Sequence, residues 1–230
     1  MTSTRGIRGS AAVMVGASLM MLAAAIAAPA QTFTLLHDFD YTDGANPLEA
    51  LVQATDGNLY GTTYYGGAGG DGTVFKITPS GSLTTLYNFC LSNGCVTGVA
   101  PDAPLIQNIN GNFYGSTASG GAGTGSYGTV FRLASGGNLT TLHSFNGKDG
   151  NLPVGRLVQA TDGNLYGTTE AGGAYGGGTV FRITSAGKMT TIYSFCPKAG
   201  CADGSYRLPA GVSLKAVPKF TLAPPFSVVP

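Results

Sequence analysis

Four cysteines in two equally spaced pairs are the side chains best suited to chemistry in this sequence. Cys90 and Cys95 form one C-x4-C pair, Cys196 and Cys201 form the other, and each pair directly follows a phenylalanine. Two thiols this close can bridge to close a small ring in an oxidising compartment. A single zinc site with four thiolate ligands is the alternative, but it requires two distant loops to converge. We therefore expect two local disulfides.

Paired carboxylates come next, because a glycosidase needs two of them at a defined separation. Asp38, Asp40 and Asp43 cluster early in the chain, while Asp71 and Glu170 lie in two glycine-rich loops of the same kind. Most acids stand in turns, where aspartate is favoured for its local hydrogen bonds. A third loop of this kind has neither acid. We expect no catalytic residue and no enzymatic activity, with a polysaccharide hydrolase or lyase using loop carboxylates as the alternative.

The glycine-rich loops 67–72 (GAGGDG) and 123–128 (GTGSYG) match the G-x-G-x-x-G pattern. A dinucleotide site requires a helix after such a loop, and here a strand pattern follows. The stretch GGAGGD also resembles the start of a calcium-binding nonapeptide. Thr73 occupies the place of the bulky apolar residue, however, and the sister loops lack the aspartate. We expect no cofactor and no metal.

Both histidines stand in a place that tyrosine fills elsewhere. His37 and His143 correspond to Tyr87 and Tyr193 in the recurring phrases described below. A residue that exchanges with tyrosine is expected to pack as an amphipathic side chain. A Ser-His-Asp arrangement therefore has no independent support.

We expect the glycine-rich loops to bind the ligand, because variable loops on a rigid scaffold commonly do so. These loops are 64–71, 118–127 and 170–177. Tyrosine offers apolar area with a polar tip, which suits a sugar or peptide surface. The expected partner is an extracellular glycan or protein. The candidate binding residues are Tyr64, Tyr65, Asp71, Tyr127, Glu170 and Tyr175.

Three phrases that recur in order must position these loops. The first phrase is DGNLYGTT at 56–63 and 162–169, with NGNFYGST at 110–117. The second phrase is GTVF, which begins at 72, 128 and 178. The third phrase is LTTLYNF at 83, LTTLHSF at 139 and MTTIYSF at 189. Asp-Gly and Asn-Gly favour tight hairpin turns. Each repeat thus predicts four strands, which in the first repeat are 48–54, 59–63, 73–78 and 83–89. The units are about 40–89, 96–145 and 146–195, and FTLLHDF at 33–39 is an orphan copy of the third phrase.

Apolar side chains on both faces of the predicted strands indicate sheets packed face to face. Phe75 and Ile77 point to one face of their strand and Val74 to the other. Four strands in about 50 residues are typical of a propeller blade. We expect an all-β, β-propeller-like array of three full four-stranded blades in a partial or open ring, with a β-solenoid as the alternative. Self-association that completes the ring is a further expectation.

The combined phrases GNLYGTT, GTVFKIT and IYSF resemble the GloVer tandem repeats of secreted bacterial proteins, often described as "choice-of-anchor". The resemblance extends from Phe33 to about Tyr206. It implies an extracellular, β-rich protein and carries no activity onto particular residues.

Residues 1–30 predict a secretory signal peptide, because an apolar run at 11–27 is followed by Ala-Pro-Ala before Gln31. The mature chain should be secreted, periplasmic or at the cell surface, with no membrane span after cleavage. Twelve basic and eleven acidic residues leave the chain near neutrality, and no basic run exists to bind nucleic acid.

The β-repeat region is expected over 31–206, followed by a degenerate Pro-rich tail at 207–230. A fourth Leu-Tyr-Gly-Thr phrase, due near 213–217, is missing. This favours a truncated or frame-shifted member of the family, and a fragment without a function of its own is a further alternative.

The paired cysteines give the first prediction. Thiol titration of the denatured but unreduced chain should detect no free thiol, because both pairs are bridged. The same titration after reduction should detect all four cysteines. Four reactive thiols before reduction would rule out both bridges.

Overall fold

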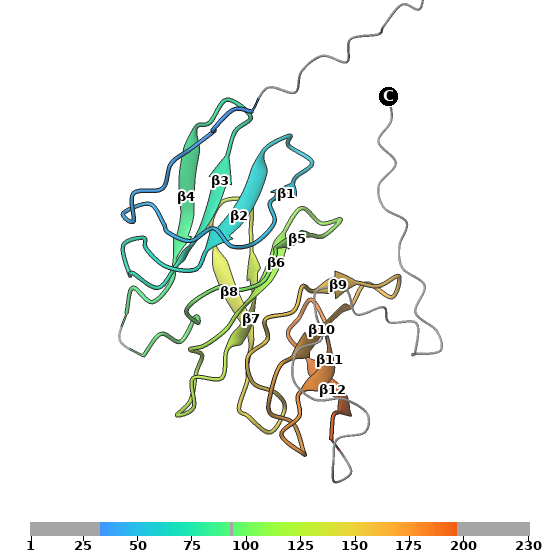
Figure 1. Cartoon of the computed structure of the whole chain (residues 1–230). Helices are drawn as coiled ribbons and strands as arrows, with labels where there is room; N and C mark the ends of the chain where they lie inside the picture. The colour runs from blue at the N-terminus through green and yellow to red at the C-terminus, as the bar shows by residue number, and fades with distance from the viewer. Residues whose placement is uncertain (1–32, 93, 197–230) are drawn as a thin grey trace, which may run out of the picture. The chain divides into compact units, whose positions relative to one another are not determined.

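The computed structural model describes residues 33–92 and 94–196, which contain twelve strands and no helix (Figure 1). The expected signal peptide at 1–30, the tail at 207–230 and Cys201 lie outside the described residues. None of the described residues belongs to a helix long and apolar enough to cross a membrane. The strands are β1 (Val52–Gln53), β2 (Leu59–Thr63), β3 (Thr73–Ile77), β4 (Leu83–Asn88), β5 (Ile106–Gln107), β6 (Phe113–Thr117), β7 (Thr129–Leu133), β8 (Leu139–Ser144), β9 (Val158–Gln159), β10 (Leu165–Thr169), β11 (Thr179–Ile183) and β12 (Met189–Ser194).

These strands form three four-stranded antiparallel sheets, each with its strands in chain order. The sheets β1–β4, β5–β8 and β9–β12 are called blades 1, 2 and 3. Every blade has a register shift at the same point of its third strand, between Val74 and Phe75 in blade 1 and between Val130 and Phe131 in blade 2. The all-β, propeller-like prediction is confirmed, and the hairpin connections exclude the β-solenoid alternative.

The first strand of each blade is shorter than predicted. We expected a strand over 48–54 in blade 1, but β1 pairs with β2 at two positions only. Asn46 has a φ of 56°, and its carbonyl accepts a hydrogen bond from the amide of Leu48 at 2.9 Å. Since Pro47 also lacks an amide hydrogen, this segment turns and cannot extend the ladder.

The Asp-Gly-Asn turn is held by its aspartate, as its composition predicts. The Asp56 carboxylate accepts hydrogen bonds from the Asn58 amide (3.0 Å), the Asn58 side chain (2.9 Å) and the Tyr60 hydroxyl (2.8 Å). Burial, together with the hydrogen bond to Asp56, raises the pKa of Tyr60 to about 12. Asp162, Asn164 and Tyr166 repeat this arrangement in blade 3, with the same three hydrogen bonds to the aspartate.

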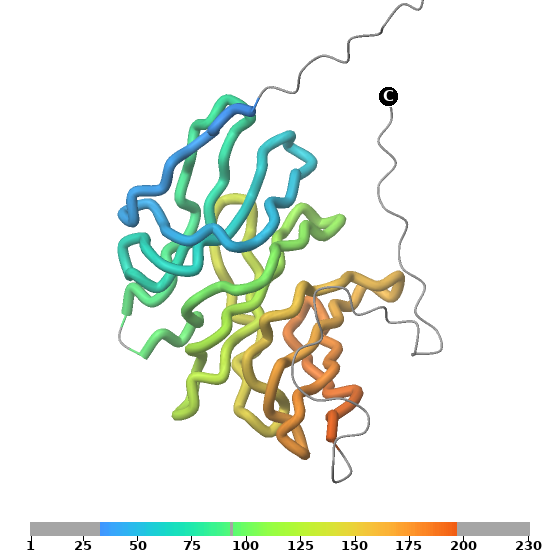
Figure 2. Tube along the Cα trace, viewed as in Figure 1, coloured from blue at the N-terminus to red at the C-terminus, as the bar shows by residue number. Residues whose placement is uncertain are grey.

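Two hydrophobic cores lie between successive blades. The first joins Tyr60, Val74 and Phe89 of blade 1 to Phe113 and Phe131 of blade 2, along with smaller apolar neighbours. The second joins the equivalent residues of blades 2 and 3 (Tyr114, Val130, Phe145, Leu165 and Phe181). Blade 2 therefore packs with one face on blade 1 and with its other face on blade 3 (Figure 2).

A phenylalanine stack marks each of these contacts. The last phenylalanine of one unit meets the central phenylalanine of the next edge to face, with centroids 5.5 Å apart for Phe89 and Phe131 and 5.3 Å apart for Phe145 and Phe181. Phe131 in turn lies over Gly115, where an added Cβ would come within 2.6 Å of its ring. The glycine of the Leu-Tyr-Gly-Thr phrase thus leaves the space that the aromatic ring fills.

The orphan phrase at 33–39 takes the place of a preceding blade at this contact. Its Phe39 ring lies 5.1 Å from that of Phe75, and the carbonyl of Leu36 lies against Gly81 just as that of Leu86 lies against Gly137. Unlike the third phrase of each blade, residues 33–39 form no strand. No described strand precedes the segment, so it has no neighbour in its own blade with which to pair.

A pair of buried threonines lies where the second strand of each blade ends and the third strand begins. The hydroxyls of Thr63 and Thr73 lie 2.8 Å apart, and those of Thr117 and Thr129 lie 2.9 Å apart. Thr129 also donates to the carbonyl of Thr97 at 3.2 Å, which ties the blade to its incoming connection. No buried side-chain nitrogen or oxygen among the described residues lacks a hydrogen-bond partner. The loops that leave these threonines therefore start from fixed points.

The stack at the blade contact gives the second prediction. Phe131→Ala should lower the free energy of unfolding by about 3–5 kcal/mol, because a fully buried ring would leave a cavity between two blades. Denaturant unfolding measures this. The exposed control Thr84→Ala should change the value by no more than about 0.5 kcal/mol. Equal stability of the two variants would contradict the proposed weight of the stack.

Candidate functional site

The glycine-rich loops and the connections between blades lie at the same end of the sheets. In blade 1 the loop 64–72 joins β2 to β3, and the connection 89–105 leaves from the end of β4. Antiparallel pairing places the end of β2, the start of β3 and the end of β4 together. The Asp-Gly hairpins lie at the other end. One edge of the array thus gathers the residues whose types could bind a ligand.

Backbone hydrogen bonds give the loop of blade 1 a defined shape. Gly66 and Gly67 both have a φ of 77°, in the left-handed region that glycine adopts without strain. The Gly66 amide donates to the Gly70 carbonyl and the Gly70 amide to the Gly67 carbonyl, both at 3.0 Å. The Ala68 amide donates to the Asn88 side chain at 2.8 Å. The glycine-rich loop is therefore held by hydrogen bonds at several points.

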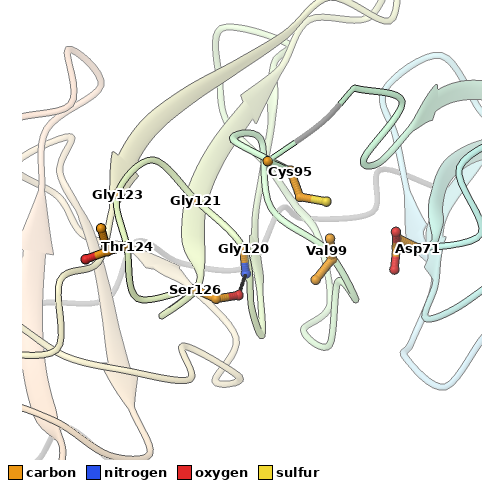
Figure 3. A pocket seen from close by; sticks show the side chains of 9 residues that line it. Asp71, Cys95, Val99, Gly120, Gly121, Gly123, Thr124 and Ser126 are labelled. Carbon is orange, nitrogen blue, oxygen red and sulfur yellow. Dashed lines mark hydrogen bonds between the residues drawn. The ribbon is translucent and has the colours of Figure 1, made fainter.

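A pocket of about 380 Å³ lies between the loops of blades 1 and 2 (Figure 3). Asp71 comes from the loop of blade 1, and Cys95 and Val99 come from the connection that follows β4. Gly120, Gly121, Gly123, Thr124 and Ser126 come from the loop of blade 2. The Ser126 hydroxyl accepts a hydrogen bond from the Gly120 amide at 2.8 Å, which fixes that rim of the pocket.

Of the predicted binding residues, only Asp71 is among the residues that line this pocket. Tyr65 is 47% exposed and Tyr175 is 58% exposed, each on its own loop. Tyr64 packs edge to face on Tyr65 with centroids 4.5 Å apart. Tyr127 is half-buried. The tyrosines therefore lie on the loop edge without sharing one cavity.

The two loop acids are not brought together in the pocket. Asp71 lines it, whereas Glu170 belongs to the loop of blade 3 and is not among its lining residues. The structure instead brings Asp71 to the cysteine pair. Cys90 and Cys95 form a disulfide with a Cα–Cα distance of 4.4 Å. Cys196 is also disulfide-bonded.

Glu49 follows the Asp38–Asp43 cluster in the sequence, and nothing in the sequence indicated that it interacts with Asp102. Burial raises the pKa of Glu49 above its usual value, and the negative charge of Asp102 raises it further. Burial also raises the pKa of Tyr64, with smaller contributions from Tyr65 and Asp102. The two acids lie on successive connections, and no spacing rule within one repeat links them.

Each histidine packs on its neighbouring phenylalanine, as expected of a residue at a position that tyrosine occupies in the other repeats. The centroid distance is 4.9 Å for His37 and Phe39, close to the 5.2 Å of Tyr87 and Phe89. A hydrogen bond adds to this, since His37 Nε2 lies 2.6 Å from the Asp43 carboxylate. His143 and Asp149 repeat it at 2.9 Å. Both histidines precede an aspartate by six positions, whereas the tyrosines in this place do not, which is a signal that the sequence contained.

Comparison with models of protein families identifies the family of this chain. The model of the Gloeobacter/Verrucomicrobia repeat matches residues 24–215. The chain belongs to this repeat family. The resemblance noted in the sequence is thereby confirmed, over a region that includes all three blades.

Among solved structures, the repeat protein resembles virginiamycin B lyase from Staphylococcus aureus at 16% identity, with a TM-score of 0.44 over 64% of this chain and 41% of that one. It also resembles a gluconolactonase from Xanthomonas campestris at 13% identity, with a TM-score of 0.44 over 63% of this chain and 48% of that one. This chain therefore spans less than half the length of either protein. No curated protein matches the sequence.

The raised pKa of Glu49 gives the third prediction. A folded-state pKa above the unfolded value means that the protonated form is favoured on folding, so the contribution of Glu49 to stability is lost as the pH rises through its folded pKa. Glu49→Gln should therefore raise the melting temperature at about pH 7 and leave it unchanged at about pH 3.

Thermal unfolding at both pH values measures this effect. In an Asp102→Asn background the gain at neutral pH should shrink, since the second cause of the shift is gone. A gain of the same size at acid pH would show that the substitution acts through packing and not through charge.

Proposed function

We propose that this repeat protein is an exported binding protein without enzymatic activity, and that the loop edge of its blades holds an extracellular glycan. The pocket between blades 1 and 2 is the primary site in this proposal. The single observation that carries it is the convergence of three segments, two loops and one connection, on one cavity at the edge where the variable loops lie.

The composition of the pocket supports a hydroxyl-rich ligand. Gly94 and Gly123 are exposed in its lining, so main-chain groups are accessible there, and the Thr124 hydroxyl and Asp71 carboxylate add side-chain partners. A volume of about 380 Å³ lies within the usual range for small-molecule sites. Val99 supplies a small apolar surface. Such a mixture of few apolar and several convergent polar groups suits one or two sugar units.

Exposed tyrosines at the same edge support contact with a longer chain. Tyr65 and Tyr175 present about half of their surface to solvent, and each lies on the glycine-rich loop of its blade. An aromatic ring with a polar tip can pack on the apolar face of a sugar and also donate a hydrogen bond. The loops of blades 1 and 3 would then bind separate parts of one polymer.

A non-enzymatic role is favoured over hydrolysis by the arrangement of acids. Glycosidases use two carboxyl groups on opposite sides of one bond. The described residues that line the pocket include one carboxylate, Asp71, and no histidine. Glu170, the other acid in the alternative hydrolase hypothesis, comes from another blade. Export is supported by the Cys90–Cys95 disulfide and by the predicted signal peptide at 1–30.

The fourth prediction tests the pocket by filling it. Thr124→Trp should abolish or weaken by at least about tenfold the binding found on a glycan array, because the indole occupies the cavity. Ala122→Trp is the matched control: Ala122 is exposed in the same loop but does not line the pocket, so its variant should bind as the parent does.

Three outcomes would contradict this proposal. Equal glycan binding by the parent and Thr124→Trp would remove the pocket from the interaction. Release of reducing sugar by the parent, lost in Asp71→Asn or Glu170→Gln, would establish the hydrolase alternative. Capture of an extracellular protein by the same pocket, with no glycan bound, would replace the ligand class.

A further inference from the structure

We propose that the Cys90–Cys95 disulfide and Asp71 form a redox-gated metal site, which binds a thiophilic divalent cation such as Zn²⁺ or Cd²⁺ once the disulfide is reduced. This inference does not depend on which organic ligand the pocket takes. It rests on the two sulfur atoms and the carboxylate oxygen, which all lie within 4.8 Å of one another.

The chemistry of these three atoms suits a zinc-like ion. Thiolate sulfur binds Zn²⁺ at about 2.3 Å and carboxylate oxygen at about 2.0–2.2 Å, so ligand atoms on one ion are separated by less than about 4.6 Å. The C-x4-C spacing also lies within the range of known zinc ligand pairs. Small side-chain rotations would therefore bring the three atoms onto one ion.

The carboxylate of Asp71 is available for this role. It makes no hydrogen bond or ion pair with any residue in the described part of the chain, although Asp71 is half-buried. Its backbone is fixed, because its carbonyl accepts a hydrogen bond from the Ala100 amide at 2.9 Å. A half-buried acid that is fixed in position and has no partner can take up a cation without first breaking other contacts.

The repeat places this side chain over the cysteines. Parallel bridges join Gly66 to Asp71 in blade 1 and Gly172 to Gly177 in blade 3, so Asp71 and Gly177 are equivalent. A Cβ added at Gly177 would come within 2.5 Å of Cys196 Sγ. The residue in this place therefore faces the cysteine after the last phenylalanine of its blade, and only in blade 1 does it carry a metal-binding group.

The pocket completes the site. Cys95 and Asp71 both line the cavity of about 380 Å³, so the ion would face it (Figure 3). Two thiolates and one carboxylate leave the fourth position of a tetrahedral ion open to water or to a bound ligand. The same opening gives a small reductant access to the Cys95 sulfur.

The site forms in two steps, reduction of the disulfide and then binding of the metal ion, and atoms and electrons balance in each step. A dithiol attacks one sulfur of the disulfide, the Cys90–Cys95 bond breaks, and the second thiol of the reductant resolves the mixed disulfide. The dithiol becomes a cyclic disulfide and loses two electrons, while both cysteines become thiols. Binding of M²⁺ to the two thiols and the Asp71 carboxylate then releases two protons.

Cadmium titration of the full chain tests the proposal. The chain is reduced, freed of reductant without oxygen, and titrated with Cd²⁺ while the thiolate-to-cadmium charge-transfer absorption is recorded. A Cys196→Ser/Cys201→Ser background leaves only the pair of blade 1. We expect one Cd²⁺ per reduced chain, none per oxidised chain, and at least about tenfold weaker binding in Asp71→Ala.

The second cysteine pair provides the matched control. A Cys90→Ser/Cys95→Ser chain keeps Cys196, Cys201 and Gly177, and it should bind Cd²⁺ as weakly as Asp71→Ala does. Circular dichroism and the melting temperature show whether each variant is folded. If the serine background does not fold, the parent chain should show two binding phases, of which Asp71→Ala removes the tighter.

Three results would each overturn the proposal. These are equal affinity with and without the Asp71 carboxylate, equal absorption from the oxidised chain, and no absorption from a folded, reduced chain whose thiols are shown to be free.

Discussion

Every other feature of this protein depends on the contact between a glycine and a phenylalanine inside each blade. An added Cβ at Gly61, Gly115 or Gly167 would lie within 2.8 Å of the central phenylalanine ring of the same blade. The ring can therefore lie against the glycine of the paired strand and still contact the last phenylalanine of the preceding unit edge to face. Without this space, the blades could not approach closely enough to exclude water from the two cores.

The packing of blades also determines what lies at their edge. The threonine pairs at the ends of the second and third strands are buried and fully hydrogen-bonded, so each loop leaves from a rigid base. The loop sequences then differ. The position before the Gly-Thr-Val-Phe phrase is filled by Asp71 in blade 1, by Tyr127 in blade 2 and by Gly177 in blade 3. Of these three residues, only Asp71 carries a charge. The three blades thus share one backbone arrangement but carry different side chains where two blades meet. The pocket lies where blades 1 and 2 meet.

Much of this frame could be predicted from the sequence, because its signals are local. The Asp-Gly turn and the alternation in Thr-Val-Phe act over a few residues, and together with the repeated phrases they predicted four strands in each blade. The first strand was predicted too long, because the turn at Asn46 competes with pairing. The pocket could not be predicted, since it joins Asp71 to Gly120 and Thr124 across a blade boundary. Glu49 and Asp102 likewise meet only after two connections have folded beside each other.

The contact of Gly137 with the Leu86 carbonyl, and of Gly187 with the Leu142 carbonyl, has a consequence for how such chains can evolve. This contact uses a main-chain carbonyl and a glycine that each unit carries, so it does not depend on which unit follows which. Recombination that adds or removes one whole unit therefore leaves every remaining contact of this kind intact. Genes of this kind can change their number of units in single steps, while selection on individual loops proceeds separately in each copy.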